Sequence, residues 1–146
     1  MSERLLHPFP GLRPAPGAAE DVAAPPYDVV SFDEAAAMAD GRPWSFLHVS
    51  RPEIDLPPGT DSHADEVYAK GATNLAAMIE AGVLIRDEAP CYYVYRIVMG
   101  DHVQTGLVAA TPVDAYLKNI VRKHEFTRPD KEDDRVRQID EVDAQT

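Results

Sequence analysis

The chain has 146 residues, about the length of one domain, of which 45% are hydrophobic and 27% are charged. These values exclude collagen-like, coiled-coil and wholly disordered chains, and the single cysteine excludes an intramolecular disulfide and a four-cysteine zinc site. The formal net charge of −11 argues against a nucleic-acid-binding protein, which normally presents a basic surface.

The first 30 residues are rich in proline, which predicts an extended lead-in packed on the rest of the chain. No apolar run typical of a signal peptide follows Met1, and no stretch is long and apolar enough to span a membrane. A lone thiol, Cys91, fits a reducing compartment and is interpreted as a small core residue. We therefore expect a cytoplasmic protein that does not contact membranes.

Local signals predict helices in the first half of the chain. Ser31 and Glu34 form a capping box and predict a helix over about residues 32–40. Residues 44–49 alternate in the manner of a half-buried strand, and His48 is interpreted as one of its satisfied polar residues. Apolar residues at helical spacing predict a helix over about residues 62–81, with Asp61 among the candidates for its cap.

The second half predicts a β-hairpin followed by helices. Residues 91–99 and 102–110 read as antiparallel strands joined by a turn at Gly100 and Asp101. A short helix to about residue 118, a short strand over 120–125 and a helix over about 129–143 follow. The expected fold class is α+β, with a mixed or mostly antiparallel sheet, the hairpin of about 91–110 at its centre, and packed helices. Residues 1–146 form a single domain or the N-terminal part of one in this interpretation.

Reactive side chains are densest in residues 122–135, where a strand is expected to lead into a helix N-terminus, a place that suits anions. His124 and Glu125 are candidates for general acid or base, and no metal site is assigned. The alternatives are a solvated helix start with Glu132 paired to Arg135, or a divalent ion held by Glu125, Asp130 and Asp134. The candidates for ligand binding in this segment are Lys123, Thr127, Arg128, Lys131 and Arg135.

Tyr27 and Asp28 form a second candidate, because the stiff Pro25-Pro26 pair can project their side chains into a cleft. Tyr27 is a candidate for ligand binding and Asp28 for a catalytic role. The alternative is a structural turn in which Asp28 caps its own backbone. No glycine-rich phosphate loop and no serine-hydrolase motif is present in the sequence.

Several blocks together resemble the prokaryotic domain-of-unknown-function family 1015. They are Phe9-Pro10-Gly11-Leu12-Arg13-Pro14, Ala24-Pro25-Pro26-Tyr27-Asp28-Val29, Ser45-Phe46-Leu47-His48-Val49 with Arg51-Pro52-Glu53, and Lys123-His124-Glu125 through Asp134-Arg135. Members of this family are typically much longer, so the resemblance implies an N-terminal portion without the C-terminal half. Members are often encoded near serine-biosynthesis enzymes, which implies a phospho-metabolite or serine-related role.

These observations lead to a functional hypothesis with two alternatives. The first is an enzyme acting on a small phosphorylated or carboxylated metabolite in a phosphotransferase-like, serine-related reaction. Arg128, Lys131 and Arg135 would hold the anion, and Asp28 would orient a partner or metal. The alternatives are a non-catalytic module that senses a metabolite or binds a protein, and a partial chain without independent activity. The expected partner is a small anionic metabolite, and the protein could also form a homo-oligomer. The cofactor stays open, with a nucleotide and magnesium as one option.

Overall fold

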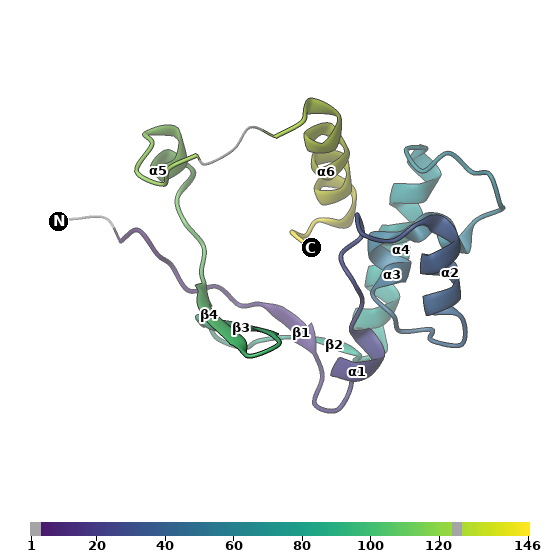
Figure 1. The fold of residues 1–146 in the computed structure, drawn as a ribbon, viewed down its shortest axis with the longest axis horizontal. Helices are drawn as coiled ribbons and strands as arrows, with labels where there is room; N and C mark the ends of the chain where they lie inside the picture. The colour runs from purple at the N-terminus through teal and green to yellow at the C-terminus, as the bar shows by residue number, and fades with distance from the viewer. Residues whose placement is uncertain (1–3, 124–126) are drawn as a thin grey trace. The chain divides into compact units, whose positions relative to one another are not determined.

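The computed structural model describes residues 4–123 and 127–146, which form two compact units. We call residues 4–13 and 86–123 the hairpin unit, and residues 14–85 and 127–146 the helical unit. About 39% of the residues are helical and 17% lie in strands, in two small antiparallel sheets, so the fold class is α+β as predicted (Figure 1). None of the helices in the described residues combines the length and hydrophobicity needed to cross a membrane.

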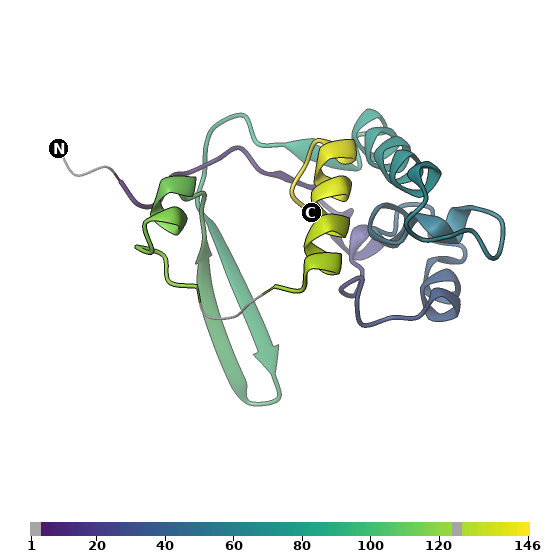
Figure 2. The same ribbon diagram turned by 90° about the horizontal axis from the view of Figure 1, so that it is seen from above.

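The helical unit is built around one long helix. Helix α4 (Asp65–Glu80) packs against α3 (Leu47–Ser50), against the 3₁₀ turn η1 (Pro52–Asp55) and against α6 (Pro129–Val142) (Figures 1 and 2). The unit also contains α1 (Ala19–Val22) and α2 (Phe32–Ala39). Its buried apolar residues include Leu47, Val49, Val67, Leu75 and Met78. Burial of each such side chain stabilises the fold by about 1.5–3 kcal/mol.

Helix α2 confirms the predicted capping box and ends one residue before the expected position. The Glu34 backbone N–H donates to the Ser31 hydroxyl at 3.4 Å, and the Ser31 backbone N–H donates to the Glu34 carboxylate at 2.8 Å. That backbone hydrogen bond also lowers the pKa of Glu34 below its ordinary value. The helix buries Ala35 and Ala39 against Leu47. Its start therefore follows directly from the local sequence.

The strand predicted over residues 44–49 is wrong, because this segment forms a turn and the short helix α3. The alternation in burial is real: Ser45, Leu47 and Val49 are buried, whereas the residues between them are half-exposed. However, the backbone N–H groups of His48 and Val49 donate to carbonyls three residues earlier. A period-two pattern identified the inward-facing side chains here but not the backbone hydrogen bonds.

Helix α4 confirms the helix predicted over 62–81 but begins three residues later. The candidate cap Asp61 instead accepts the backbone N–H of His63 at 3.0 Å, so Ala64 becomes the N-cap without a side-chain hydrogen bond. Within α4, a Cβ on Gly71 would lie 3.1 Å from Cγ of Pro52 and 3.2 Å from the carbonyl oxygen of Val49. Gly71 therefore permits the close approach of α4 to α3 and η1.

The hairpin unit contains the predicted β-hairpin. Strands β3 (Tyr93–Met99) and β4 (His102–Val108) pair antiparallel, with Val94 opposite Leu107 and Val98 opposite Val103. Gly100 has a positive φ of 58°, which the tight turn requires. The hairpin is a two-stranded sheet of its own, and strands β1 (Leu12–Pro14) and β2 (Leu84–Arg86) form the other sheet. The sequence predicted that this hairpin lies at the centre of a larger sheet with helices packed on it. In the described residues it is instead a separate two-stranded sheet.

A polar cluster fixes the N-terminal segment within the hairpin unit. The Tyr93 hydroxyl accepts the backbone N–H of Gly11 at 2.6 Å and lies 2.6 Å from the Asp87 carboxylate. Two nitrogens of the Arg13 guanidinium donate to the same carboxylate, at 2.5–3.1 Å. The hydrogen bonds from Arg13 and then Tyr93 lower the pKa of Asp87 to about 2. The contacts of Gly11 with Tyr93 and of Arg13 with Asp87 join residues that lie more than seventy positions apart in the sequence.

After the hairpin, α5 (Val113–Leu117) confirms the predicted short helix, with Pro112 as its N-cap. Residues 120–123 do not form the strand expected there, and 124–125 lie outside the described residues. Helix α6 confirms the helix predicted over 129–143, with Pro129 in its first turn. The expectation of a single domain, with residues 1–30 packed on it, stays a prediction.

Candidate functional site

A cavity of about 260 Å³ lies within the helical unit and is lined mostly by polar side chains. Four segments form its walls: the loop before α2, the end of α3 with η1, the start of α4, and α6. The lining residues are Tyr27, Asp28, Ser50, Arg51, Pro52, Glu53, Ser62, His63, Val67, Tyr68, Lys131, Asp134, Arg135 and Gln138. Because α4 packs on α6, residues from the first half of the chain meet residues of its last helix at this cavity.

Arg51 holds the loop that carries Tyr27 and Asp28. Its guanidinium donates to the backbone carbonyls of Tyr27 at 2.9 Å and Val30 at 2.6 Å. Its Nε donates to the carboxylate of Glu53 at 2.6 Å, and Glu53 is only 6% exposed. A buried carboxylate requires such a partner, because an unpaired buried charge is strongly unfavourable. Arg51 therefore fixes the loop at the edge of the cavity.

Asp134 and Arg135 bring α6 to the same cavity. The Arg135 guanidinium donates to Oδ2 of Asp134 at 2.5–3.0 Å and lies 3.9 Å from the centre of the Tyr27 ring. A cation over an aromatic ring contributes about 0.5–2 kcal/mol, depending on how far it is desolvated. The loop before α2 and helix α6 are thus joined through Tyr27 and Arg135.

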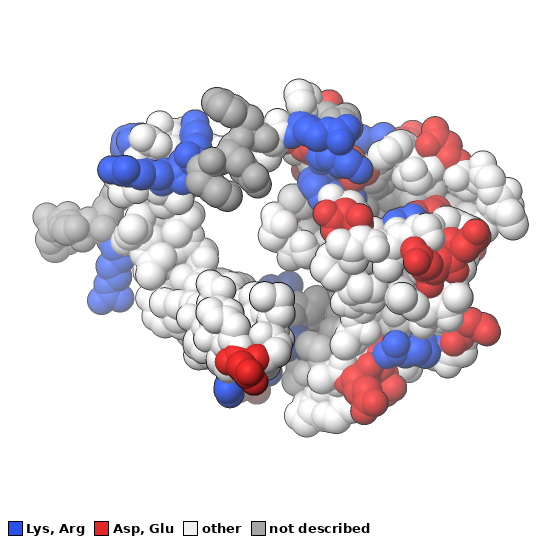
Figure 3. Space-filling view, viewed as in Figure 1, with Lys and Arg blue, Asp and Glu red and all other residues white. Residues whose placement is uncertain are grey.

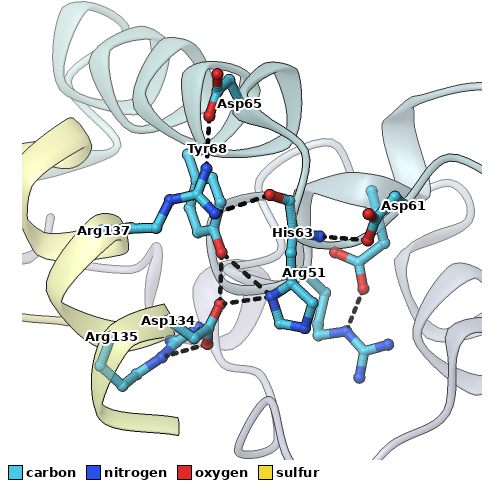
Figure 4. Close-up of polar contacts among 9 residues, drawn as sticks. Arg51, Asp61, His63, Asp65, Tyr68, Asp134, Arg135 and Arg137 are labelled. Atoms are coloured by element: carbon cyan, nitrogen blue, oxygen red, sulfur yellow. Dashed lines mark hydrogen bonds and ion pairs between the residues drawn. The ribbon is translucent and has the colours of Figure 1, made fainter. Parts of the chain in front are cut away.

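Tyr68 and His63 converge on the other oxygen of Asp134 (Figure 4). The Tyr68 hydroxyl donates to Oδ1 of Asp134 at 2.7 Å. Nδ1 of His63 lies 3.3 Å from that same Oδ1 and 3.3 Å from the Tyr68 hydroxyl oxygen. Arg137 holds these groups from α6: it lies 4.3 Å from the Tyr68 ring centre and donates to the backbone carbonyl of His63 at 2.9 Å.

These contacts move two pKa values in opposite directions. Burial, followed by the hydrogen bond to Asp134, raises the pKa of Tyr68 to about 12. Burial alone would raise the pKa of Asp134, but the hydrogen bonds from Tyr68 and Arg135, with the nearby charges, outweigh it and lower that pKa. At neutral pH, Tyr68 is therefore a neutral donor and Asp134 is an ionised acceptor.

The Ser50 hydroxyl is the one buried side-chain polar atom in the described residues that has no hydrogen-bond partner. Most buried hydroxyl groups in proteins are hydrogen-bonded, because loss of hydration without a replacement partner costs about 1–3 kcal/mol. Ser50 also lines the cavity, so its hydroxyl group is a candidate to bond a molecule bound there.

The model of the family described as "Protein of unknown function (DUF1015)" matches residues 6–146. The chain belongs to the DUF1015 family. This is the family that the sequence motifs resemble. No curated protein and no solved structure matches the chain.

The structure brings four of the predicted site residues of this DUF1015 chain to the cavity. Tyr27 and Asp28 line it from the loop before α2, and Lys131 and Arg135 line it from α6. The sequence presented these pairs as separate candidates about a hundred positions apart. Asp28 therefore belongs to a cavity wall, and its carboxylate accepts no hydrogen bond from the donors of the described residues.

The other predicted site residues lie elsewhere or outside the described residues. The Thr127 hydroxyl bonds the Glu132 carboxylate at 2.8 Å, and the backbone carbonyl of Arg128 caps the start of α6. Lys123 belongs to the hairpin unit, where its ammonium lies 4.6 Å from the Tyr116 ring centre. His124 and Glu125 are not among the described residues.

Sequence reasoning missed most of the cavity wall in this DUF1015 chain. It did not single out His63, Tyr68 or Gln138, and it considered Asp134 only as a metal ligand. Within the described residues, no group of three or more His, Cys, Asp or Glu side chains is arranged to hold a metal ion. The Arg51-Pro52-Glu53 block was noted only for its resemblance, although two opposite charges flanking a proline could have indicated a buried ion pair.

Proposed function

We propose that the cavity of the helical unit binds a small phosphorylated or carboxylated metabolite, and that the protein is an enzyme acting on it. The observation that carries this proposal is Lys131. It lines the cavity, and no hydrogen bond or ion pair joins its ammonium to another residue whose side chain the structure describes. An ammonium group that lines a polar cavity and has no ion pair with a described side chain favours an anionic ligand.

Most of the charged side chains that line the cavity are paired with one another. Arg51 is paired with Glu53, and Arg135 is paired with Asp134. Lys131 and Asp28 then remain as the charged lining residues without a described ion pair. Lysine and arginine side chains also gather over the start of α6, whereas acidic side chains lie over α2 (Figure 3).

The arrangement can serve a phosphotransferase-like reaction. Lys131 would bind the anionic group, the Arg135 guanidinium would supply further donors, and the Ser50 hydroxyl would bond a ligand oxygen. Asp28 would orient a second group of the ligand, whereas the roles of His124 and Glu125, which lie outside the described residues, as general acid or base stay a prediction from the sequence. We further propose that the site binds the phosphate group of a serine-related metabolite and that the protein is cytoplasmic.

A titration of the wild-type chain with inorganic phosphate and with small phosphorylated and carboxylated acids tests the proposal. Nucleotides with and without magnesium belong in the same panel. Binding should raise the melting temperature, and Lys131→Met should weaken binding by about tenfold or more, as expected for loss of a charge-assisted hydrogen bond. The melting temperature of the unliganded variant should stay near that of the wild type, because the Lys131 side chain is exposed.

Lys118→Met is the matched control, because it removes one ammonium group from an exposed pair with Asp114 in the hairpin unit. It should leave ligand binding unchanged. Equal affinities of the wild type and Lys131→Met would contradict the anion site. Saturable binding without any product would leave the site in place but favour the non-catalytic sensing module over the enzyme.

A further inference from the structure

His63 presents one ring nitrogen to a fixed carboxylate, and its other ring nitrogen has no hydrogen-bond partner among the described residues. Nδ1 lies 3.3 Å from both Oδ1 of Asp134 and the hydroxyl oxygen of Tyr68. Nε2 makes no hydrogen bond to another described residue, and the side chain is 58% exposed at the cavity. In Figure 4 the Nδ1 edge of the ring faces Asp134 and Tyr68.

The position of the ring proton follows from the two groups that face Nδ1. The Tyr68 hydroxyl gives its own proton to Asp134, at 2.7 Å, so its oxygen can offer only a lone pair to His63. The ionised Asp134 carboxylate also accepts and does not donate. Nδ1 therefore carries the hydrogen, and in the neutral ring the lone pair resides on Nε2.

We propose that His63, oriented by Asp134 and Tyr68, is the proton acceptor of the cavity; this inference rests on the proposed function of the cavity as a small-anion site. Nε2 takes the proton from a hydroxyl group of the bound metabolite as that O–H bond breaks. The electron pair stays on the oxygen, which is left negatively charged beside the imidazolium of His63. The Asp134 carboxylate stabilises the imidazolium that forms and remains ionised, because Arg135 and Tyr68 still donate to it.

A second histidine of the helical unit shows what a purely structural role looks like. Nδ1 of His48 lies 2.8 Å from the Asp55 carboxylate, and Nε2 lies 3.2 Å from the backbone carbonyl oxygen of Arg42. Both of its ring nitrogens therefore lie against oxygen atoms of the protein, and neither is open to a ligand. His48 is the internal comparison for His63.

Nitrogen-15 NMR of the imidazole groups in the wild-type chain tests the inference directly, with His63→Gln used to assign the signals. The Nδ1–H form of His63 should exceed the Nε2–H form by roughly tenfold, the ratio that a charge-assisted hydrogen bond provides. Asp134→Asn should bring the two forms toward equal populations. Diethyl pyrocarbonate should acylate His63 at Nε2 about tenfold faster than His48, with inorganic phosphate slowing the reaction at His63.

A dominant Nε2–H form of His63 would overturn the inference, and so would acylation of His63 that is no faster than that of His48. If Asp134→Asn does not fold, the tautomer and the acylation rate of the wild-type protein still decide. The tautomer of His63 and its acylation rate without phosphate do not depend on Lys131, so a failed anion titration would overturn the proposed function separately.

Turnover provides an independent criterion once a metabolite from the binding panel is converted. His63→Gln should then lower kcat by about 100-fold or more while changing ligand affinity by no more than about twofold. His102→Gln, in β4 of the hairpin unit, should leave turnover unchanged. Unchanged turnover in His63→Gln, or loss of turnover only on replacement of His124, would assign the proton transfer to another group and overturn the inference.

Discussion

The hydroxyl group of Tyr68 in α4 donates a 2.7 Å hydrogen bond to the Asp134 carboxylate in α6, across 66 positions of the sequence. Both residues are buried, at 4% and 9% exposure. This bond therefore joins the two longest helices of the helical unit at the wall of the cavity. It sets the position of the carboxylate that His63 and Arg135 also contact.

Replacement of Tyr68 by phenylalanine should weaken the contact between α4 and α6. The buried carboxylate would lose one of its donors while keeping Arg135, so the free energy of unfolding should fall by about 1–3 kcal/mol. Urea unfolding of the two proteins at pH 7 measures the difference. Tyr95→Phe is the control: Tyr95 is 62% exposed, and its replacement should change stability by less than about 0.5 kcal/mol. Equal effects of the two substitutions would contradict a structural role for the Tyr68 hydroxyl.

Acid should weaken the hairpin unit through Asp87. Its folded pKa of about 2 lies below its ordinary value of 3.8, so the ionised group stabilises the folded state above that ordinary value. This contribution should disappear as the pH falls from about 4 to about 2. Asp87→Asn should therefore lower the melting temperature at pH 7 and have little effect at pH 2.

Melting curves of both proteins between pH 7 and pH 2, followed by circular dichroism, measure this convergence. Asp133→Asn controls for the loss of one negative charge at an exposed position. If the melting temperatures of the wild type and Asp87→Asn differ by the same amount at every pH, the charge of Asp87 does not cause the loss of stability.

Replacement of Ser50 by alanine should separate stability from binding. The Ser50 hydroxyl has no partner in the described residues, so its removal should leave the free energy of unfolding unchanged or slightly higher. Phosphate affinity should nevertheless fall by up to about tenfold, because the ligand would lose one hydrogen bond. Calorimetric titration measures this, with Thr105→Ala, which removes an exposed hydroxyl group in β4 of the hairpin unit, as the control. A clear loss of stability without change in affinity would place an internal partner at Ser50 instead.

Replacement of Gly71 by alanine should destabilise the helical unit, although alanine is the better helix former by about 1 kcal/mol. The new Cβ would lie 3.1 Å from Pro52 and 3.2 Å from the Val49 carbonyl oxygen, and such overpacking typically costs about 1–3 kcal/mol. Thr73→Ala, on the exposed face of the same helix, should be neutral or slightly stabilising. Denaturant unfolding measures the change in the free energy of unfolding for both substitutions. A more stable Gly71→Ala would contradict the prediction, because it would show that Pro52 and Val49 shift to accommodate the new Cβ.

The sequence predicted the elements that depend on local signals. The capping box of Ser31 and Glu34 starts α2, and Gly100 closes the hairpin, because both act on backbone groups a few residues away. Residues 44–49 were misassigned because their burial alternates while no neighbouring strand pairs with them. Tertiary contacts determine the secondary structure of this segment, and no local sequence pattern indicates those contacts.

In the candidate site, too, some residues could be predicted from local sequence and others depend on tertiary contacts. Tyr27, Asp28, Lys131 and Arg135 were selected for their chemistry, and the packing of α4 on α6 brings their segments to one cavity. His63 and Tyr68 carried no such signal, because a histidine in a loop and a tyrosine in a helix are individually ordinary. Their importance comes from Asp134, which lies some seventy positions away.

The hairpin has a consequence for how the chain behaves before it is fully folded. Both of its faces carry exposed apolar side chains, including Val94, Val98 and Met99, and segments with high β-propensity and little charge promote intermolecular strand pairing. Arg96 is the single lysine, arginine, aspartate or glutamate in the two strands. It therefore acts as a gatekeeper against aggregation, since an extra strand added to β3 would have to accommodate its charge.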